Sequence, residues 1–247
     1  MYWLRNIWYK IQDAWDWFLD HTILYWIGII ILSSLSICLI FNQQIKGIIV
    51  HGYKPSITLS QLEKNENSNA SYNYDGVKDL TLQNAAKARA DASQLKPIGV
   101  ISVPSCNVNV PIAKGTSNNT LALAAGTMRP DMKMGQGNYA LAGHNMANNT
   151  GILFTPLFYK AKKGQKVYIS NFKKVYEYQI YQRMVVAPSR VDLVRNTKAR
   201  ICTLVMCDET GNQRVILRGK LKKIRNFENM PKSIQKDLSK AYTNVAK

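Results

Sequence analysis

Hydrophobic and polar positions follow a different pattern in each part of the chain. Apolar side chains recur every three or four residues over the first 22 residues, with polar side chains between them, which is typical of an amphipathic helix. The next residues, 23–41, are apolar and uncharged and could span about 28 Å as a helix. The pattern predicts an interfacial amphipathic segment over 1–22 and a transmembrane signal anchor over 23–41.

A cleaved signal peptide is the alternative for this apolar run. The run is longer than the usual apolar region of a signal peptide, and no clear cleavage site of the A-x-A type follows it. All five tryptophans lie in the first 26 residues, as expected of a helix near a membrane surface. We therefore expect an uncleaved anchor.

Polar composition marks the segments on either side of the next domain. Residues 42–76 include the stretch QLEKNENSNASYNYDG, which predicts a flexible extracytoplasmic linker. Residues 77–96 are rich in alanine and end at a proline, so we predict an N-terminal helix of the domain there. Residues 228–247 are polar and basic, which predicts a C-terminal tail with room for one short helix over 231–246.

Residues 97–227 consist of short runs rich in Val, Ile, Leu and Tyr, separated by turn-forming residues. This pattern predicts strands. The runs are IGVISV, LALAAG, NYALAG, KVYIS, YEYQIYQRMVV, ICTLVMC and RVILRGKL. Seven or eight strands at this spacing favour an all-β domain that is closed or nearly closed.

The formal net charge of +18 would attract polyanions. The basic residues are scattered along the predicted strands, however, and no helix-turn-helix or zinc-finger spacing is present. For a domain tethered to a membrane, anionic wall polymers or lipid head groups are the expected partners. We predict no nucleic-acid binding.

Three of the four cysteines lie in the predicted domain. Cys202 and Cys207 are five residues apart on one predicted strand, so their side chains point to opposite faces and cannot easily pair. No CxxC spacing occurs. We therefore predict no disulfide framework, no metal site and no cofactor, and we assign Cys202 to packing.

The domain contains one imidazole, because His21 and His51 flank the apolar segment. His144 follows a predicted strand in the sequence AGHN, where a glycine turn would hold its ring at a strand end. Cys207 ends another predicted strand, and a hairpin closed by DETGN would place Arg214 across from it. Each of these residues alone is more often structural than catalytic.

Together, the three side chains fit acyl transfer. A thiolate attacks a carbonyl, an imidazole protonates the departing amine, and a guanidinium stabilises the developing oxyanion. Arginine suits the last role because it stays charged and offers several donors.

Four motifs in the same order resemble those of the sortases of Gram-positive bacteria. They are GQGNYALAGHNM from Gly135, KKGQKVY from Lys162, TLVMC from Thr203 and RVILRG from Arg214, and the resemblance runs from about Pro97 to Arg225. It implies an eight-stranded sortase-type β-barrel with short helices, preceded by a transmembrane helix. It also implies a single-pass membrane protein with a cytoplasmic N-terminus and an extracytoplasmic catalytic domain.

The resemblance further implies a cysteine transpeptidase that cleaves an LPxTG-type sorting signal between Thr and Gly. Surface proteins bearing this signal would form a thioacyl-enzyme on Cys207 and pass to the amine of lipid II or peptidoglycan. His144 matches the acid/base histidine of the family, and Arg214 matches its oxyanion-stabilising arginine. The family's pocket for the sorting signal carries over to Ala142, Val186, Pro188, Val191, Leu193, Val194 and Val205.

Class A is favoured because no second apolar span and no Asp-Pro lid motif occur. The threonine that usually precedes the nucleophile is replaced here by Met206. Some class A members bind calcium through acids ahead of the histidine strand, but Thr127 to Asn138 contains only Asp131. We predict no calcium dependence, and a several-fold calcium activation of peptide cleavage would contradict this.

Two other functions are alternatives to a sortase. Another cell-wall cysteine transpeptidase or peptidase, such as an L,D-transpeptidase, would have its arginine much closer to the nucleophile than Arg214 is to Cys207. A tethered basic module that binds wall polymer would need neither Cys207 nor His144. Its polymer binding would be salt-sensitive and would survive mutation of Cys207.

Overall fold

The computed structural model describes residues 2–73, 80–146 and 151–246, in two compact units: residues 1–45 and residues 46–247. The first unit contains the helices α1 (Tyr2–Asp20) and α2 (Thr22–Ile40) and the start of α3 (Asn42–His51). Within the described residues, α2 is the one helix that is long and apolar enough to cross a membrane. Its apolar side chains are exposed on all sides, as expected of a helix that lipid surrounds.

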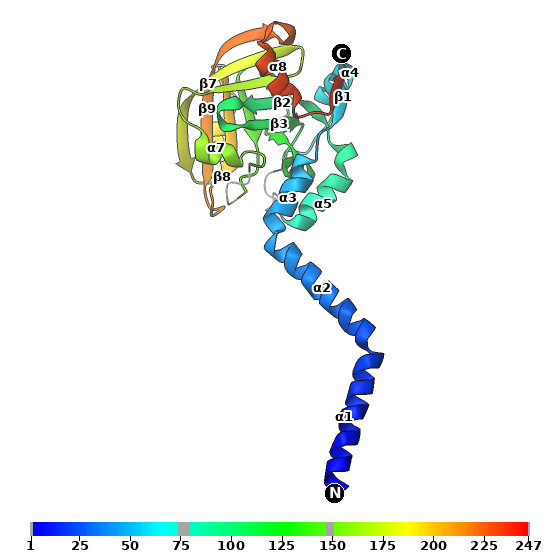
Figure 1. Cartoon of the computed structure of the whole chain (residues 1–247). Helices are drawn as coiled ribbons and strands as arrows, with labels where there is room; N and C mark the ends of the chain where they lie inside the picture. The colour runs from blue at the N-terminus through cyan, green and yellow to red at the C-terminus, as the bar shows by residue number, and fades with distance from the viewer. Residues whose placement is uncertain (1, 74–79, 147–150, 247) are drawn as a thin grey trace. The chain divides into compact units, whose positions relative to one another are not determined.

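Eight strands of the second unit form a closed barrel in the order β2-β3-β4-β5-β8-β9-β7-β6 (Figure 1). The predicted eight-stranded barrel is therefore confirmed. The strands are β2 (Pro97–Val103), β3 (Val108–Ala113), β4 (Ala125–Thr127), β5 (Asn138–Ala142), β6 (Lys166–Ser170), β7 (Lys174–Val186), β8 (Ile201–Cys207) and β9 (Arg214–Asn226).

Strand alternation separates the barrel core from a second apolar cluster on the outer face. On β8, the side chains of Cys202, Leu204 and Met206 belong to the main core. The side chain of Val205 points to the other face, where it packs with Ile216 and other apolar residues. Successive side chains of a strand point to opposite faces, so Cys207 shares the outer face with Val205.

Short helices lie between and around the strands. They are α4 (Leu59–Glu66), α5 (Leu82–Ala90), α6 (Asn118–Leu123), α7 (Thr155–Lys160) and α8 (Lys232–Ser239), with the 3₁₀ turns η1 (Ala92–Gln94), η2 (Pro104–Cys106), η3 (Val191–Val194) and η4 (Phe227–Asn229). The predicted N-terminal helix of the domain, 77–96, is present as α5 and η1. The part of that prediction at residues 77–79 lies outside the described residues.

The predicted flexible linker, 42–76, is wrong for much of its length. It contains α3, the strand β1 (Ser56–Thr58) and α4, which begins at a capping box between Thr58 and Gln61. Ile57 and Leu62 are buried against the barrel, although the surrounding sequence is polar. Val50 and Tyr53 of the same segment are buried as well, and this burial, with the helix cap, favours an ordered segment on the barrel surface.

The described part of the predicted C-terminal tail, 228–246, contains the expected short helix as α8, but it packs on the barrel and is not a free tail. α8 contacts β2, and the strand β10 (Asn244–Ala246) pairs in parallel with β1 (Figure 1). Leu238 and Tyr242 are buried, and the Tyr242 hydroxyl donates a hydrogen bond to the carbonyl oxygen of Gly99 at 2.5 Å. The two ends of this unit therefore pack together on the barrel.

One predicted strand is divided between a helix and a strand, and one strand was missed. The first half of the run LALAAG ends α6, because Ser117 caps the backbone N–H of Thr120 and the Leu/Ala sequence then favours a helix, whereas its last two residues begin β4. The missed strand, β3, contains Pro111, which cannot donate a ladder hydrogen bond. β3 tolerates it beside β4, with which it pairs only at Ile112 and Ala113.

Candidate active site

The β8/β9 hairpin brings Cys207 and Arg214 together. The two strands pair antiparallel, and Cys207 lies directly opposite Arg214 at the end of the ladder. Residues directly opposite each other in such a ladder have Cβ atoms about 4.5–5.5 Å apart, on the same face. This is the placement that the hairpin prediction requires.

The loop between these strands is held by the side chain of Asp208. Its Oδ1 accepts a hydrogen bond from the backbone N–H of Gln213 at 3.0 Å, and its Oδ2 accepts one from the Thr210 hydroxyl at 2.7 Å. The bond from Gln213 is the main cause that lowers the pKa of Asp208 below its usual value. The ionised carboxylate therefore fixes the turn that sets Arg214 against Cys207.

His144 reaches the same place from β5. β5 pairs in parallel with β8, with Ala142 opposite Val205, so two further residues along each chain bring His144 level with Cys207. Two hydrogen bonds continue this contact: the backbone N–H of Gly143 donates to the Val205 carbonyl at 3.0 Å, and the side-chain Nδ2 of Asn145 donates to the Cys207 carbonyl at 3.0 Å. The two strands that pair with β8 thus supply the other two side chains: β5 leads to His144, and β9 begins with Arg214.

The three side chains line one pocket of about 100 Å³. All three are partly exposed, so a ligand can reach them. The other lining residues are Leu121, Met128, Ala142, Gly143, Val205 and Met206. A pocket with an imidazole, a thiol and a guanidinium at an apolar wall suits an extended peptide whose carbonyl must be activated.

Arg214 is oriented by the loop that precedes it. Its Nη1 donates to the carbonyl oxygens of Gly211 and Gln213, each at 3.0 Å. A guanidinium carries five N–H donors, and these bonds use only those of Nη1, which leaves capacity for the oxygens of a bound peptide. The loop therefore holds the charged group in place without saturating it.

The residues predicted to bind the sorting signal fall into two groups. Five of them belong to or pack on the apolar cluster of the outer face, which also contains Met128, Ala140 and Ile216; they are Ala142, Val186, Leu193, Val194 and Val205. Pro188 and Val191 are instead exposed on the loop between β7 and β8, and Val191 has 55% of its surface accessible. The structure gathers the first group in one cluster, of which Ala142 and Val205 also line the pocket with Cys207, and leaves the second group at the loop surface.

Cys202 has the opposite environment to Cys207. It is fully buried in the main core, and burial raises the pKa of its thiol to about 12. The interpretation of Cys202 as a packing residue is confirmed. A thiol so rarely ionised is a poor nucleophile.

Several residues at this site were missed from the sequence. Asn145 bonds the Cys207 carbonyl, and Ile216 lies opposite Val205 in the apolar cluster. Ile216 could have been found from strand alternation, since it is two residues after Arg214. Leu121 and Met128 come from distant segments, and no local pattern marks them.

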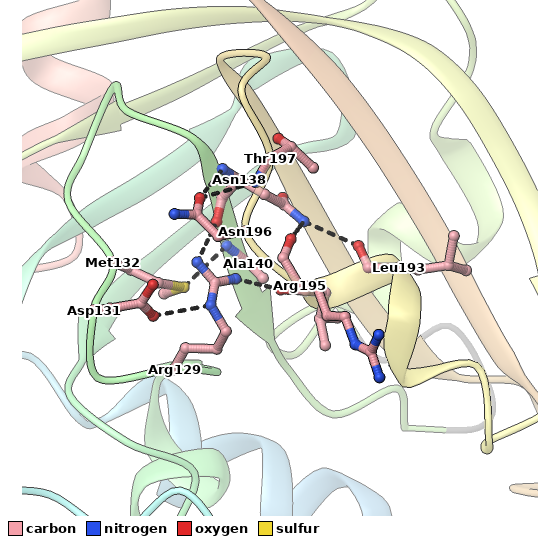
Figure 2. Close-up of polar contacts among 10 residues, drawn as sticks. Arg129, Asp131, Met132, Asn138, Ala140, Leu193, Arg195, Asn196 and Thr197 are labelled. Atoms are coloured by element: carbon pink, nitrogen blue, oxygen red, sulfur yellow. Dashed lines mark hydrogen bonds and ion pairs between the residues drawn. The ribbon is translucent and has the colours of Figure 1, made fainter.

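The segment ahead of the histidine strand has its single acid already paired. Asp131 Oδ1 lies 2.9 Å from Arg129 Nε (Figure 2). Across the described residues, no group of three or more His, Cys, Asp or Glu side chains is placed to hold a metal ion. Calcium independence remains a prediction.

Comparison with known proteins bears on the family. The model of the sortase domain matches residues 101–222. Sortase A of Streptococcus agalactiae is 34% identical over 231 residues, which cover 89% of this chain and 93% of that protein. The chain belongs to the sortase family.

Sortase A of Listeria monocytogenes is 34% identical over 78% of this chain and 90% of its own length. The crystal structure of Listeria sortase A matches with a TM-score of 0.54 and 35% identity, covering 58% of this chain and 97% of that one.

These likenesses assign the chain to class A. As a class A sortase, it is a cysteine transpeptidase that cleaves the LPxTG-type signal of a surface protein and transfers the protein to a cell-wall amine. Which residues of this chain carry out the reaction is inferred below from the geometry of its own site.

Proposed function

We propose that Cys207 is the nucleophile of this sortase, His144 its general acid and base, and Arg214 the group that stabilises the oxyanion. One observation carries the proposal: β8 pairs with β9 and with β5, so Arg214 and His144 flank Cys207 from both neighbouring strands. In this register all three side chains line one pocket.

The first half of the reaction forms a thioester. The Cys207 thiolate attacks the carbonyl carbon of the signal's threonine, and the carbonyl electron pair moves onto oxygen, where Arg214 donates hydrogen bonds to it. When this oxyanion collapses, the Thr–Gly bond breaks. The protonated imidazole of His144 gives its proton to the departing glycine amine.

The second half reverses the roles. The amine of the acceptor attacks the thioester carbonyl, neutral His144 takes the proton from the attacking nitrogen, and the Cys207 thiolate leaves. An amide bond replaces the one that was cut, and the enzyme is restored. We propose that the acceptor is the amine of the membrane-bound precursor lipid II.

The apolar cluster on the outer face would receive the leucine and proline of the signal. Val205 and Ile216 lie two residues from Cys207 and Arg214 on paired strands, which places an apolar floor next to the reacting groups. Ala142, Val186, Leu193 and Val194 form its sides, and Pro188 and Val191 would contact peptide at the loop surface. The burial of apolar side chains there would supply binding energy.

We further propose that α2 spans the cell membrane with α1 on the cytoplasmic side and the barrel outside. The exposed apolar surface of α2 supports a bilayer environment, and the outward placement puts the site where both substrates occur.

The test uses residues 46–247 with a fluorogenic LPxTG peptide and triglycine as acceptor. We expect Cys207→Ala to abolish cleavage and transfer, and Arg214→Ala to lower kcat by about 10²–10³-fold. Cys202→Ala, which removes a thiol from the same strand, is the matched control and should keep wild-type turnover. Normal turnover by Cys207→Ala would overturn the proposal.

A further inference from the structure

The loop between β7 and β8, residues 187–200, forms part of the apolar cluster beside the site. Its 3₁₀ turn η3 carries Leu193, which is buried, and Val194, which packs on the same cluster. Most of the remaining loop residues are exposed. A loop of this kind holds one conformation only where specific contacts fix it.

Asn138, the first residue of β5, binds this loop with both protons of its side-chain amide and binds β8 with its amide oxygen. Its Nδ2 donates to the carbonyl oxygens of Leu193 at 2.9 Å and Arg195 at 3.0 Å, and its Oδ1 accepts from the Thr203 hydroxyl at 2.7 Å (Figure 2). Asn138 is only 1% exposed. Both amide protons are used and the oxygen is occupied, so the orientation of the amide is set by the barrel.

Arg129 completes the set of contacts from the segment between β4 and β5. Its Nη1 donates to the Val194 carbonyl, its Nη2 to the Asn138 carbonyl at 3.2 Å, and its Nε pairs with Asp131 (Figure 2). The side chain is 17% exposed. Three consecutive carbonyls at the end of η3, those of residues 193–195, are thus bonded by two side chains from outside the loop.

These bonds satisfy carbonyl groups at the end of the 3₁₀ turn η3. The last carbonyls of a helical turn have no partner within the turn, and a buried carbonyl without a partner is costly. Charged donors make the stronger hydrogen bonds. The contacts therefore favour the loop conformation in which Leu193 and Val194 face the apolar cluster.

The distance from the reacting groups separates this role from catalysis. Asn138 begins β5, whereas His144 follows its end, six residues later, which is about 20 Å along an extended chain. Asn138 therefore does not touch the reacting groups, and its hydrogen bonds and those of Arg129 reach the apolar cluster through the loop.

We propose that Arg129 and Asn138 are positioning residues that hold the β7/β8 loop in its peptide-binding conformation before the sorting signal arrives. The role rests on the proposed function of the apolar cluster. A preformed wall lowers the ordering cost of peptide binding, so its loss should weaken binding more than chemistry.

The test compares Arg129→Ala and Asn138→Asp with the wild type, in the full chain in detergent micelles. The aspartate has the size of asparagine but turns a carboxylate oxygen toward two carbonyl oxygens. We expect KM for the LPxTG peptide to rise about 10-fold while kcat changes less than about threefold. Arg129→Lys keeps the charge but loses the planar set of N–H donors, so its KM should be intermediate. It replaces Arg129→Ala in the test if the alanine variant does not fold.

A second measurement does not depend on activity. Arg190, Arg195, Lys198 and Arg200 are exposed in the loop, so brief trypsin digestion followed by mass spectrometry reports how often the loop opens. Cleavage at these sites should be about 10-fold faster in both variants, with the melting temperature of the barrel little changed. Arg89→Ala is the control, because it also removes an arginine bond to a backbone carbonyl, that of Gly52 at 3.0 Å, but on α5.

The failure of the positioning role and the failure of the proposed function would give different results. If KM and loop cleavage in both variants match those of Arg89→Ala, the positioning role is wrong. It is also wrong if the rise in KM is accompanied by a fall in kcat, in the Cys207 alkylation rate and in the melting temperature. If the wild-type enzyme itself does not cleave the peptide, the proposed function fails. Loop cleavage then still decides whether Arg129 and Asn138 hold the loop.

Discussion

At the residue scale, the two cysteines of β8 show how strand alternation assigns different chemistry to the same side chain. Cys202 lies in the barrel core, where burial raises its pKa to about 12, whereas Cys207 lines a pocket with His144 and Arg214. At pH 8, about one Cys202 thiol in ten thousand would be ionised.

Alkylation should therefore distinguish the two thiols. With iodoacetamide at pH 8 and the folded protein, we expect peptide mass spectrometry to find Cys207 modified and Cys202 unmodified. Cys106 should resemble Cys202, since it is also buried and burial raises the pKa of its thiol. Equal labelling of all three after denaturation is the control. Labelling of Cys202 at the rate of Cys207 in the folded protein would contradict this account.

Gly143, which precedes His144, packs closely against a buried side chain. A β-carbon at this position would lie 2.6 Å from Cδ2 of Phe154, which is fully buried. We expect Gly143→Ala to destabilise the domain by about 1–3 kcal/mol and to lower kcat, because the strain moves His144. Thermal melting and peptide turnover measure the two effects.

A smaller side chain at position 154 provides the check on that explanation. The double variant Gly143→Ala/Phe154→Leu should be less unstable than the sum of the two single variants, because the two side chains compete for one space. Additive losses would mean that the clash is not the cause.

At the element scale, the segments that flank the barrel stabilise it although they are polar overall. β1 and α4 bury Ile57 and Leu62, and β1 pairs with β10 at the C-terminal end. Residues 46–247 should therefore unfold at a higher temperature than residues 77–247, by several degrees, since the shorter chain loses this pairing and the burial of both apolar side chains. Calorimetry of the two chains measures the difference, and equal melting temperatures would refute the structural role of β1 and α4.

At the scale of the whole molecule, an apolar helix and a basic catalytic unit have separate tasks. The net charge of +18 favours contact with anionic surfaces, while α2 supplies the apolar length needed for a membrane span. The proposed topology has a direct consequence. Protease added to intact protoplasts should degrade the barrel and leave a membrane-bound fragment that contains α1 and α2.

Detergent lysis before the protease provides the comparison, because α1 then becomes accessible as well. If the barrel is protected until the cells are lysed, the proposed orientation is reversed. Recovery of the whole chain in the soluble fraction would instead argue against the anchor.

The sequence by itself determined the apolar span and the barrel class and predicted the site residues, because each depends on local periodicity or on motifs contiguous in the chain. His144, Cys207 and Arg214 all lie at strand ends that alternation and turn residues mark. Only the tertiary structure decided that residues 42–76 and 228–247 fold onto the barrel, since their order depends on a surface made by distant strands. The same holds for the contacts of Arg129 and Asn138 with η3, which join residues more than fifty positions apart. Hydrogen bonds between segments so distant leave no periodic trace in the sequence, because each depends on where the barrel brings two chain segments together.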